Sequence, residues 1–500
     1  PGYQVSTAFR YLDCNFFAHD PICDRGVIRG AALMGPNWFY ATILNKDIQT
    51  KQVDSLDLQN NGLRLRWRQQ WNPSLATEIL AINSDFSYDY QYAFKVAPRS
   101  QDNRIGVKNN QICEKQLQLN NTYLTANKQQ IRTGYHLQHY SVESRITTQN
   151  RNNSPSDQRR DNIMLVHSLY ADFNTDPKQK WGVEAGIRLN YLQRSLPANN
   201  QQKNSFLEPR LRLWYQPTEH LQLYGNAGKY FQFLNQIIEF DGDEASIEMP
   251  VWVLGGAKDL PFLNATQYQV GAVWQQKSLL IDVQLYQKNI DGLTSRASNF
   301  DEFVASRFLE GNANIRGVDV LIKKRWGQFR SWWSYSYSDI EHRFQDFFDP
   351  IFPALTEQPH QFHWVNTYKI GQFDLSLGWK IASGTPYSNR DYFRIERRMS
   401  MDGQENLSQL QPIENQFNSE RLPAQHQLDL SVNYTYQAQR CKAVFGLSLF
   451  NVYNQENIYS RSFFIGQRSS NQQGPPRLEL RYLDRANLGF TPNAVVRLEW

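Results

Sequence analysis

The sequence contains no run of about 18 apolar residues, the length that a membrane-spanning helix needs. Its hydropathy over 500 residues is low throughout. Helical membrane spans are therefore excluded. A membrane is not excluded, because a spanning β-barrel alternates lipid-facing and lumen-facing residues and its average hydropathy resembles that of a soluble protein.

A strong charge of either sign is also missing, since 53 Lys and Arg stand against 48 Asp and Glu. No long block of like charge indicates a nucleic-acid partner. The two short basic runs, at residues 323–325 and 397–398, fit solvated turns. No charged and apolar leader precedes Pro1. We expect the chain to be a fragment of a longer one.

Cysteine is scarce, with four residues. Cys14 and Cys23 lie in a predicted surface loop, and we expect them to form a disulfide in an oxidising compartment. His19 lies between them, so half of a metal site is the alternative, although the spacing matches no familiar ligand pattern. Cys113 and Cys441 fall at opposite ends of their predicted strands, and we do not expect them to pair.

Catalytic motifs are missing as well. The sequence contains no GxSxG, no P-loop, no HExxH and no paired CxxC. His360 and His363 share a predicted strand, where solvated or lumen-facing positions are favoured over a metal site. Residues 241–244, DGDE, offer oxygen ligands for calcium, with a solvated acidic loop tip as the favoured alternative. We predict no enzymatic activity, no cofactor and no metal.

Aromatic residues and long alternating segments are what the sequence does contain. There are 13 Trp, 26 Tyr and 29 Phe. Apolar and polar residues alternate strictly over residues 181–191, 372–381 and 428–436, and more briefly at 63–67 and 281–285. About ten residues of period two is the length that a tilted strand needs to cross a bilayer. Strands of soluble sandwiches are typically about five or six residues long. The pattern predicts an all-β protein, a transmembrane antiparallel β-barrel.

The links between these segments are alternately short and long. Short links lie at 216–218, 276–278, 326–328, 371 and 437–441, and long ones at 233–264, 291–312, 340–359 and 386–423. Outer-membrane barrels show this asymmetry, with brief periplasmic turns and long extracellular loops. The phase predicts about twenty strands, including a hairpin of 25–34 with 38–48 and a single strand over 442–460. It also places the loop at 13–24 outside the cell.

Five motifs resemble the barrel of TonB-dependent receptors, the energised transporters of Gram-negative outer membranes. Residues 311–320, GNANIRGVDV, look like the family's "RGVE" start of a strand, with Asp319 in place of Glu. Residues 332–338, WWSYSYS, resemble the "SYTYS" strand that follows. The others are 379–387 (WKIASGTPY, like "SGxPY"), 422–429 (LPAQHQLD, like "LPxYHRLD") and 449–454 (LFNVYN, like "NLFN-YN"). We expect Gly384 to adopt a backbone φ that other residues rarely adopt. The side chains of Asn451 and Asn454 suit either hydrogen bonds to polar groups in the lumen or the capping of a turn. The sequence also ends in VRLEW, an alternating segment with a terminal aromatic residue. The last strand of bacterial outer-membrane barrels usually ends in this way.

The resemblance implies a barrel of the 22-stranded class, a plug that fills it, and a segment that engages TonB. Residues 1–500 then form the barrel domain, with the plug and the first strands expected outside this sequence. The implied partners are the TonB complex of the inner membrane, outer-membrane lipids and lipopolysaccharide, a nutrient ligand and a surface lipoprotein. The implied location is the outer membrane of a Gram-negative bacterium.

The candidate ligand-binding residues lie in the long links, where aromatic rings supply contact area and cations bind carboxylates or phosphates. Loops that pack on each other or on lipopolysaccharide would have the same composition. The candidates are Trp252, Lys258, Phe347, Phe352, Tyr387, Tyr392, Arg394 and Arg397.

Three functions remain open at this point. The first is active uptake of a scarce large nutrient, such as an iron chelate, a vitamin or an oligosaccharide, with energy from TonB. The second is a passive channel, although porins have about 16 to 18 strands. The third is a surface barrel that binds or scaffolds a partner without transport.

Overall fold

The computed structural model consists of β-strands and the links between them. It describes residues 2–9, 12–19, 26–45, 50–95, 103–150, 156–195, 201–238, 251–257, 260–296, 308–346, 350–388, 393–399, 405–412, 417–439, 441–468 and 477–499. None of these residues belongs to a helix that is long and apolar enough to cross a membrane.

One antiparallel sheet of 23 strands forms the wall of the molecule. Three of its members are short and lie within links, namely β12 (Leu234–Ile238), β13 (Trp252–Leu254) and β18 (Ile351–Pro353). The other members are β1 (Gly2–Phe9), β2 (Leu12–His19), β3 (Gly26–Asn45), β4 (Thr50–Asn72), β5 (Leu75–Lys95), β6 (Asn103–Leu124), β7 (Gln130–Asn150), β8 (Ser156–Asn174), β9 (Trp181–Ser195), β10 (Gln201–Thr218), β11 (Leu221–Gln232), β14 (Leu263–Gln276), β15 (Leu279–Arg296), β16 (Phe308–Trp326), β17 (Phe329–Phe344), β19 (His360–Ile370), β20 (Phe373–Ala382), β25 (Gln425–Gln437), β26 (Lys442–Phe450) and β29 (Thr491–Glu499).

Six more strands form three two-stranded ribbons outside the wall. They pair β21 (Pro386–Tyr387) with β24 (Glu420–Arg421), β22 (Phe393–Met399) with β23 (Glu405–Pro412), and β27 (Ile458–Arg468) with β28 (Arg477–Ala486).

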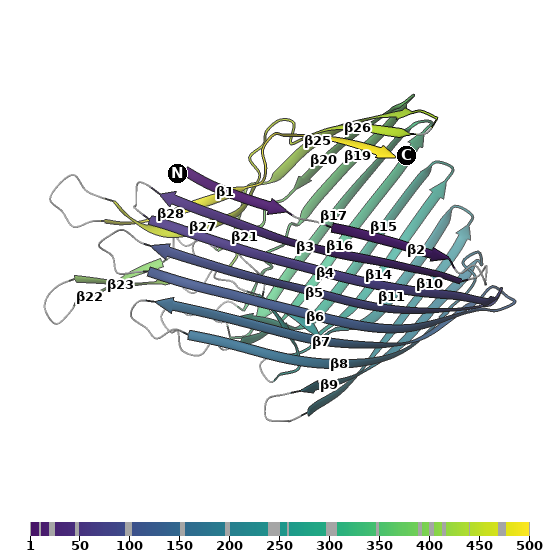
Figure 1. The fold of residues 1–500 in the computed structure, drawn as a ribbon, viewed down its shortest axis with the longest axis horizontal. Helices are drawn as coiled ribbons and strands as arrows, with labels where there is room; N and C mark the ends of the chain where they lie inside the picture. Colours follow the sequence, from purple (N-terminus) through teal and green to yellow (C-terminus); the bar gives the residue numbers. More distant parts are fainter. Residues whose placement is uncertain are drawn as a thin grey trace.

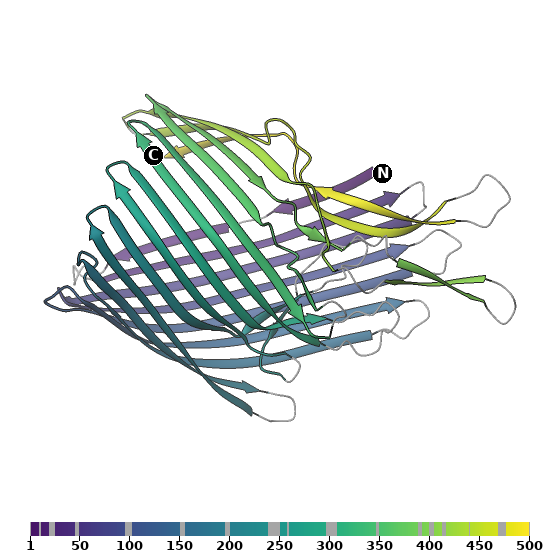
Figure 2. The ribbon, with the colours of Figure 1, turned by 180° about the vertical axis from the view of Figure 1, so that it is seen from behind.

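The wall curves around an interior. Strands β3 to β8 lie in front in Figure 1 and behind in Figure 2, while β14 to β20 take the opposite places. Neighbours along the chain pair antiparallel, and β12 pairs parallel with β15. The prediction of an antiparallel all-β wall with about twenty long strands is confirmed.

Alternation along each strand divides the wall into an apolar and a polar face. In β10, Leu207, Leu211 and Leu213 are 50%, 42% and 49% exposed, and Glu208, Arg210 and Arg212 point to the opposite face. Large leucines exposed in a row are unfavourable in water but favourable against lipid. The apolar face is therefore the outer one, and the polar face lines the interior.

The strand links differ between the two ends of the wall. Two-residue turns at 277–278, 327–328 and 371–372 join strands at one end, whereas Ile238, Arg296 and Phe308, the strand ends beside two of the long links, lie at the other. Gly327 and Gly371 have φ of 58° and 57°, a conformation that costs a residue with a side chain more than glycine. The predicted phase of short and long links is confirmed for these hairpins. We call the two ends the turn end and the loop end.

The predicted hairpin of 25–34 with 38–48 is wrong, because β3 is one strand from Gly26 to Asn45. The residues between the two predicted strands include Gly35 and Pro36, which are common in turns. In the structure, β1 pairs with β3 down to Asn37 and β2 pairs from Met34, so the proline lies where the partner changes and a missing N–H costs little. As a result, His19 and Gly26 lie at the turn end, whereas the predicted phase put the 13–24 link at the same end as the long links.

The predicted strand over 442–460 is also wrong. β26 ends at Phe450, and a turn at 451–457 leads into the β27–β28 ribbon. Asn451 and Asn454 have φ of 51° and 53°, which asparagine tolerates better than most residues. The side chain of Asn451 accepts a hydrogen bond from the Gln455 N–H at 2.8 Å, so the turn-cap alternative is confirmed for this residue.

Orientation in the membrane is testable by cysteine labelling. We expect Asn264→Cys, at the start of β14 on the loop end, to react with a membrane-impermeant maleimide on intact cells. Gln328→Cys, in the two-residue turn after β16, should react only after lysis. The opposite pattern would invert the membrane orientation of the wall.

Candidate functional site

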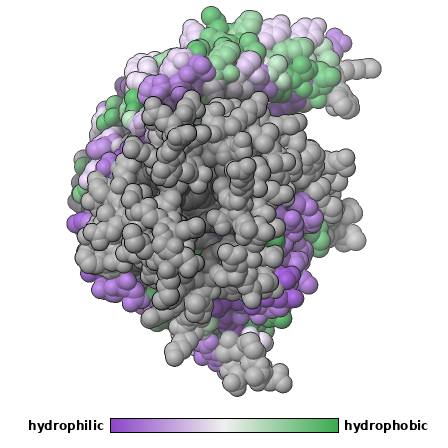
Figure 3. Space-filling model, turned by 90° about the vertical axis from the view of Figure 1, so that its left-hand side faces the viewer, coloured by the Kyte–Doolittle hydropathy of each residue, from purple (hydrophilic) through white to green (hydrophobic). Residues whose placement is uncertain are grey.

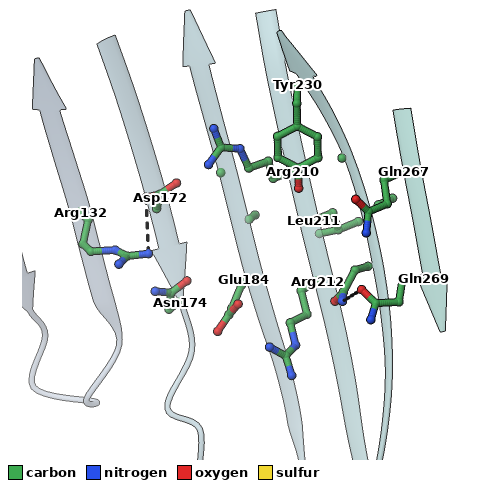
Figure 4. A pocket seen from close by; sticks show the side chains of 15 residues that line it. Arg132, Asp172, Asn174, Glu184, Arg210, Leu211, Arg212, Tyr230, Gln267 and Gln269 are labelled. Atoms are coloured by element: carbon green, nitrogen blue, oxygen red, sulfur yellow. Dashed lines mark hydrogen bonds and ion pairs between the residues drawn. The ribbon is translucent and has the colours of Figure 1, made fainter. Parts of the chain in front are cut away.

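The inner face of the wall carries a polar pocket that we call the wall pocket. It has a volume of about 320 Å³ and is formed by strands β7 to β11 and β14. Its charged and aromatic lining residues are Arg132, Asp172, Glu184, Arg210, Arg212 and Tyr230 (Figure 4). Each occupies the alternate, inward position of a strand whose other side chains face outward.

Cations outnumber carboxylates in the wall pocket. Three arginines face two carboxylates among the lining residues, and Arg210 also pairs with the Glu208 carboxylate just beyond the lining. Arg132 lies 3.5 Å from Asp172. The guanidinium of Arg210 lies 5.3 Å from the ring centre of Tyr230, and that of Arg212 lies 5.2 Å from Tyr224. Cations held over aromatic faces keep N–H groups available to an anion.

The buried carboxylate of Glu208 lies next to the pocket, on the side that faces the loop end. Glu208 is 5% exposed and accepts hydrogen bonds from Asn190 Nδ2 at 2.9 Å, from Arg210 Nη2 at 3.0 Å and from the Phe231 N–H at 3.1 Å. Ser168 donates to Asn190 at 2.7 Å and extends the chain to β8. Four neighbouring strands are therefore tied together by one anion.

The link between β12 and β14 folds back onto the inner wall. We call residues 251–257 and 260–262 the mouth segment. Asn110 of β6 donates to Trp252 O at 3.0 Å and to Glu143 O at 2.9 Å, and its Oδ1 accepts from the Trp252 N–H at 2.8 Å. Asn110 is 1% exposed. A side-chain amide that matches a backbone N–H and C=O in this way fixes the segment against β6 and β7.

A second polar contact and an apolar cluster complete this attachment. Arg194 of β9 donates to Gly255 O at 2.8 Å and to Asn162 Oδ1 at 2.7 Å. Leu254 is fully buried in a cluster formed by inward-facing wall residues, namely Val142, Met164, Val166 and Leu192, together with Phe233. Burial of one leucine stabilises by about 1.5–3 kcal/mol. The mouth segment is thus a packed part of the interior.

Two further links are joined at the loop end. Glu357, 3% exposed, forms an ion pair with Arg421, and Asn418 donates to Pro353 O at 2.8 Å. Seen from this end, the described residues around the rim present both hydrophilic and apolar surface (Figure 3).

Among the predicted ligand residues, three have described surroundings. Trp252 lies in the mouth segment. Phe352 is 3% exposed and packs 6.1 Å from the Phe344 ring and 5.6 Å from Phe417. Tyr387 lies beside Arg461, whose Nη1 donates to its hydroxyl at 3.1 Å. These residues lie in separate clusters, and their roles in ligand binding stay predictions.

The other predicted residues have no described surroundings. Arg394 and Arg397 lie in β22, paired with β23, but their side chains are outside the description. Lys258, Phe347, Tyr392 and the acidic segment 241–244 lie outside the described residues.

Three of the four cysteines lie among the described residues. Cys14 lies in β2, opposite Ala32 of β3, and not in a loop as predicted. Cys23 lies outside the described residues, so their disulfide stays a prediction. Cys113 and Cys441 are free thiols.

Ribbon β27–β28 holds Tyr387 in place through Arg461. The Arg461 guanidinium donates to Asp484 at 2.6 and 2.8 Å and lies 4.3 Å from the ring centre of Tyr482. These hydrogen bonds to Asp484 raise the pKa of Arg461, so this cation stays charged at every physiological pH.

The structure gives a role to two of the motif residues, and for Gly384 it differs from the prediction. Gly384 is required by close approach, because an added Cβ would collide with the backbone of Leu422. Asp319 accepts a hydrogen bond from Gln284 at 2.8 Å on the inner wall.

The sequence analysis did not single out the wall pocket or Asn110. The signal for the pocket was present, because Arg210 and Arg212 occupy the polar positions of an alternating strand. Nothing local marks Asn110, since its partner Trp252 is 142 residues away.

Comparison with known proteins places this wall in a family. A family model described as "TonB dependent receptor-like, beta-barrel" matches residues 24–454. Fiu, the ferric-catecholate import receptor of K12 E. coli, is 10% identical, with a TM-score of 0.57 over 91% of this chain and 77% of Fiu. BauA, the ferric preacinetobactin receptor of Acinetobacter baumannii, is 11% identical, with a TM-score of 0.56 over 99% and 79%. FpvA of P. aeruginosa, solved with a pyoverdine and iron, is 10% identical, with a TM-score of 0.58 over 92% and 68%.

Identities this low show a shared fold only. No curated protein sequence matches the chain. The family model, however, covers most of the 500 residues. The chain belongs to the TonB-dependent receptor-like β-barrel family.

Proposed function

We propose that this chain is the barrel domain of an outer-membrane receptor that imports a scarce large nutrient with energy from TonB. The observation that carries the proposal is the inner wall of a family barrel, polar along its length and cationic at the wall pocket. A lumen lined in this way solvates a polar ligand and gives it no covalent chemistry. The proposed location is the outer membrane of a Gram-negative bacterium.

An anionic metal chelate is the ligand class that the charges favour. Arg132, Arg210 and Arg212 present guanidinium groups to the interior, and guanidinium binds carboxylate and phenolate-type oxygens through paired N–H donors. The structural neighbours Fiu and BauA are receptors for ferric chelates by name. We therefore propose an iron chelate as the nutrient.

We place the ligand mouth at the loop end. Trp252 and Tyr387 are held there by the mouth segment and by Arg461, respectively. Lys258, Phe347, Phe352, Tyr392, Arg394 and Arg397 belong to the same group of links. In this proposal the TonB complex acts through a plug region, and a surface lipoprotein is a further candidate partner.

The test is uptake of a radiolabelled ferric chelate by cells that express the complete gene as their only iron receptor. We expect uptake to depend on TonB. Reversing two wall charges, Arg210→Glu with Arg212→Glu, should lower uptake at least about tenfold, because two charge-assisted contacts are lost. Arg325→Glu, a charge reversal beside the turn at Gly327, is the matched control and should leave uptake unchanged.

Uptake that persists without TonB would show a passive channel. Ligand binding without uptake would show a surface binding barrel. Either result would replace the transport proposal.

A further inference from the structure

Three polar side chains interrupt the apolar outer face of the wall near the turn end. Lys324, Ser331 and Asn366 lie opposite one another on β16, β17 and β19, and we call them the polar row. Alternation places this row on the outer face, because Trp326 and Tyr368, two positions from Lys324 and Asn366, belong to the exposed apolar set at 51% and 42%. The polar row therefore faces lipid.

Aromatic side chains border the polar row on both sides. The next row toward the turn end is Trp326, Phe329 and Tyr368, and the next toward the loop end is Ile322, Trp333 and Trp364. The ring centre of Phe329 lies 5.7 Å from that of Trp326 and 6.4 Å from that of Tyr368. Tryptophan and tyrosine gather at the headgroup level of membranes, because each combines an apolar ring with a polar N–H or O–H. The polar row thus lies within an interfacial aromatic belt.

The length of β16 places Lys324 at one edge of the lipid-facing band. Between Lys324 and Arg316, the outward side chains are Val318, Val320 and Ile322. Eight residues separate the two cations, about 27 Å at 3.4 Å per residue. For a tilted strand that is close to the ~25 Å apolar band of outer-membrane barrels. In the orientation proposed for the wall, the turn end faces the periplasm, and the leaflet on that side of the outer membrane consists of glycerophospholipids.

Lys324 supplies the charge of the polar row. Its Nζ lies 5.9 Å from the centre of the Trp326 ring, and among the described residues no carboxylate forms an ion pair with it. A cation over an aromatic face keeps its N–H groups available to an anion. The polar row and the two rows beside it contain no aspartate or glutamate. This part of the wall is therefore complementary to a phosphate and offers no partner to a lipid ammonium.

Asn366 is an amide buried in a lipid-facing wall. It is 9% exposed, and in the described part of the chain neither its Oδ1 nor its Nδ2 has a hydrogen-bond partner. Its neighbour Ser331 differs, because Ser331 Oγ accepts from Trp364 Nε1 at 3.1 Å. An unpaired amide is unfavourable against hydrocarbon. A headgroup that both donates and accepts hydrogen bonds would supply the missing partner.

We propose that the polar row binds the headgroup of one phosphatidylglycerol molecule from the leaflet at the turn end. Two strand spacings, about 10 Å, separate the backbones of Lys324 and Asn366, and the headgroup lies across them. The phosphate contacts the Lys324 ammonium. The glycerol hydroxyls bond to the Asn366 amide, since hydroxyls and amides both donate and accept. One acyl chain lies along Ile322 and Val320 toward the middle of the band.

The test is native mass spectrometry of the full-length protein, released from nanodiscs that hold equal amounts of phosphatidylglycerol and phosphatidylethanolamine. We expect one retained phosphatidylglycerol per barrel. Lys324→Gln should lower its retention about tenfold, because a charge-assisted contact is lost. Asn366→Leu should lower the preference for phosphatidylglycerol over phosphatidylethanolamine about fivefold, because the hydrogen bonds to the glycerol are lost. Lys178→Gln, which removes the same charge from an exposed position in the link between β8 and β9, is the matched control and should change nothing.

Asn366→Leu decides the test if Lys324→Gln does not fold, since it places an apolar side chain of similar size against lipid. Equal retention of the two lipids, unchanged retention in both variants, or an equal loss in Lys178→Gln would overturn the proposal.

The proposal rests on the membrane placement of the wall in the proposed function and not on the transported ligand. Iron uptake assayed in the same variants separates the two. A lipid site that fails leaves TonB-dependent uptake intact, and a barrel that retains phosphatidylglycerol without importing iron keeps the lipid site.

Discussion

Replacing Asn110 with alanine is expected to release the mouth segment from the inner wall. Amide exchange at Trp252 should accelerate by about 10- to 100-fold, because each buried backbone group that loses its partner costs about 1–3 kcal/mol. Asn110 serves three such groups, two on Trp252 and one on Glu143. Hydrogen–deuterium exchange of the full-length protein in detergent measures the effect.

Asn289→Ala is the control for this substitution. Asn289 is also a wall asparagine with a side-chain partner, Asn314, but it lies on the outer face. Exchange in the mouth segment should be unchanged there. If Asn110→Ala folds and residues 251–257 keep their protection, the apolar cluster around Leu254 alone holds the segment, and the role given to Asn110 is wrong.

Of the substitutions proposed here, removal of the Glu208 carboxylate should lower the stability of the fold most. Glu208→Ala is expected to lower the free energy of unfolding by about 3–5 kcal/mol, as for other buried pairs that lose one partner. It leaves Asn190, Arg210 and the Phe231 N–H without their acceptor. Urea unfolding in detergent micelles, followed by tryptophan fluorescence or by heat-modifiable migration on gels, gives the measurement.

Two further variants separate charge from hydrogen bonding. Glu208→Gln keeps one acceptor oxygen and should lose less than the alanine variant. Glu184→Ala removes an exposed carboxylate from the same wall and should change stability by no more than about 0.5 kcal/mol. Equal losses at positions 184 and 208 would refute the special role of the buried group.

Strands in the middle and at the end of the chain were predictable from alternation. The alternating segments at 181–191, 372–381 and 428–436 correspond to β9 at Trp181–Ser195, β20 at Phe373–Ala382 and β25 at Gln425–Gln437. The physical reason is that lipid on one face and a polar lumen on the other impose period two along the whole strand.

Errors arose where turn-forming residues lie inside a strand, or where a turn lacks glycine and proline. Gly35 and Pro36 remain extended because β3 changes partner beside them. The turn at 451–457 is made by asparagines with positive φ, in a segment that otherwise continues the strand pattern. Both features depend on neighbouring chain segments, which local sequence does not show.

The candidate site was less predictable than the fold. Composition indicated aromatic and cationic links, and Trp252 and Tyr387 lie in two short strands within them. It did not indicate which residues hold the links, because Asn110, Arg194 and Glu357 act through partners far away in sequence. Contacts of this kind follow from the curvature of the wall around its interior.

The unequal lengths of the links at the two ends have a consequence for how this protein tolerates change. One residue added to a two-residue turn such as 277–278 alters the register of both flanking strands, and every side chain after it would exchange lipid for lumen. Residues added to a long link leave the register of the wall as it is. Insertions, epitope tags and natural length variation should therefore accumulate at the loop end, while the turn end keeps a fixed length.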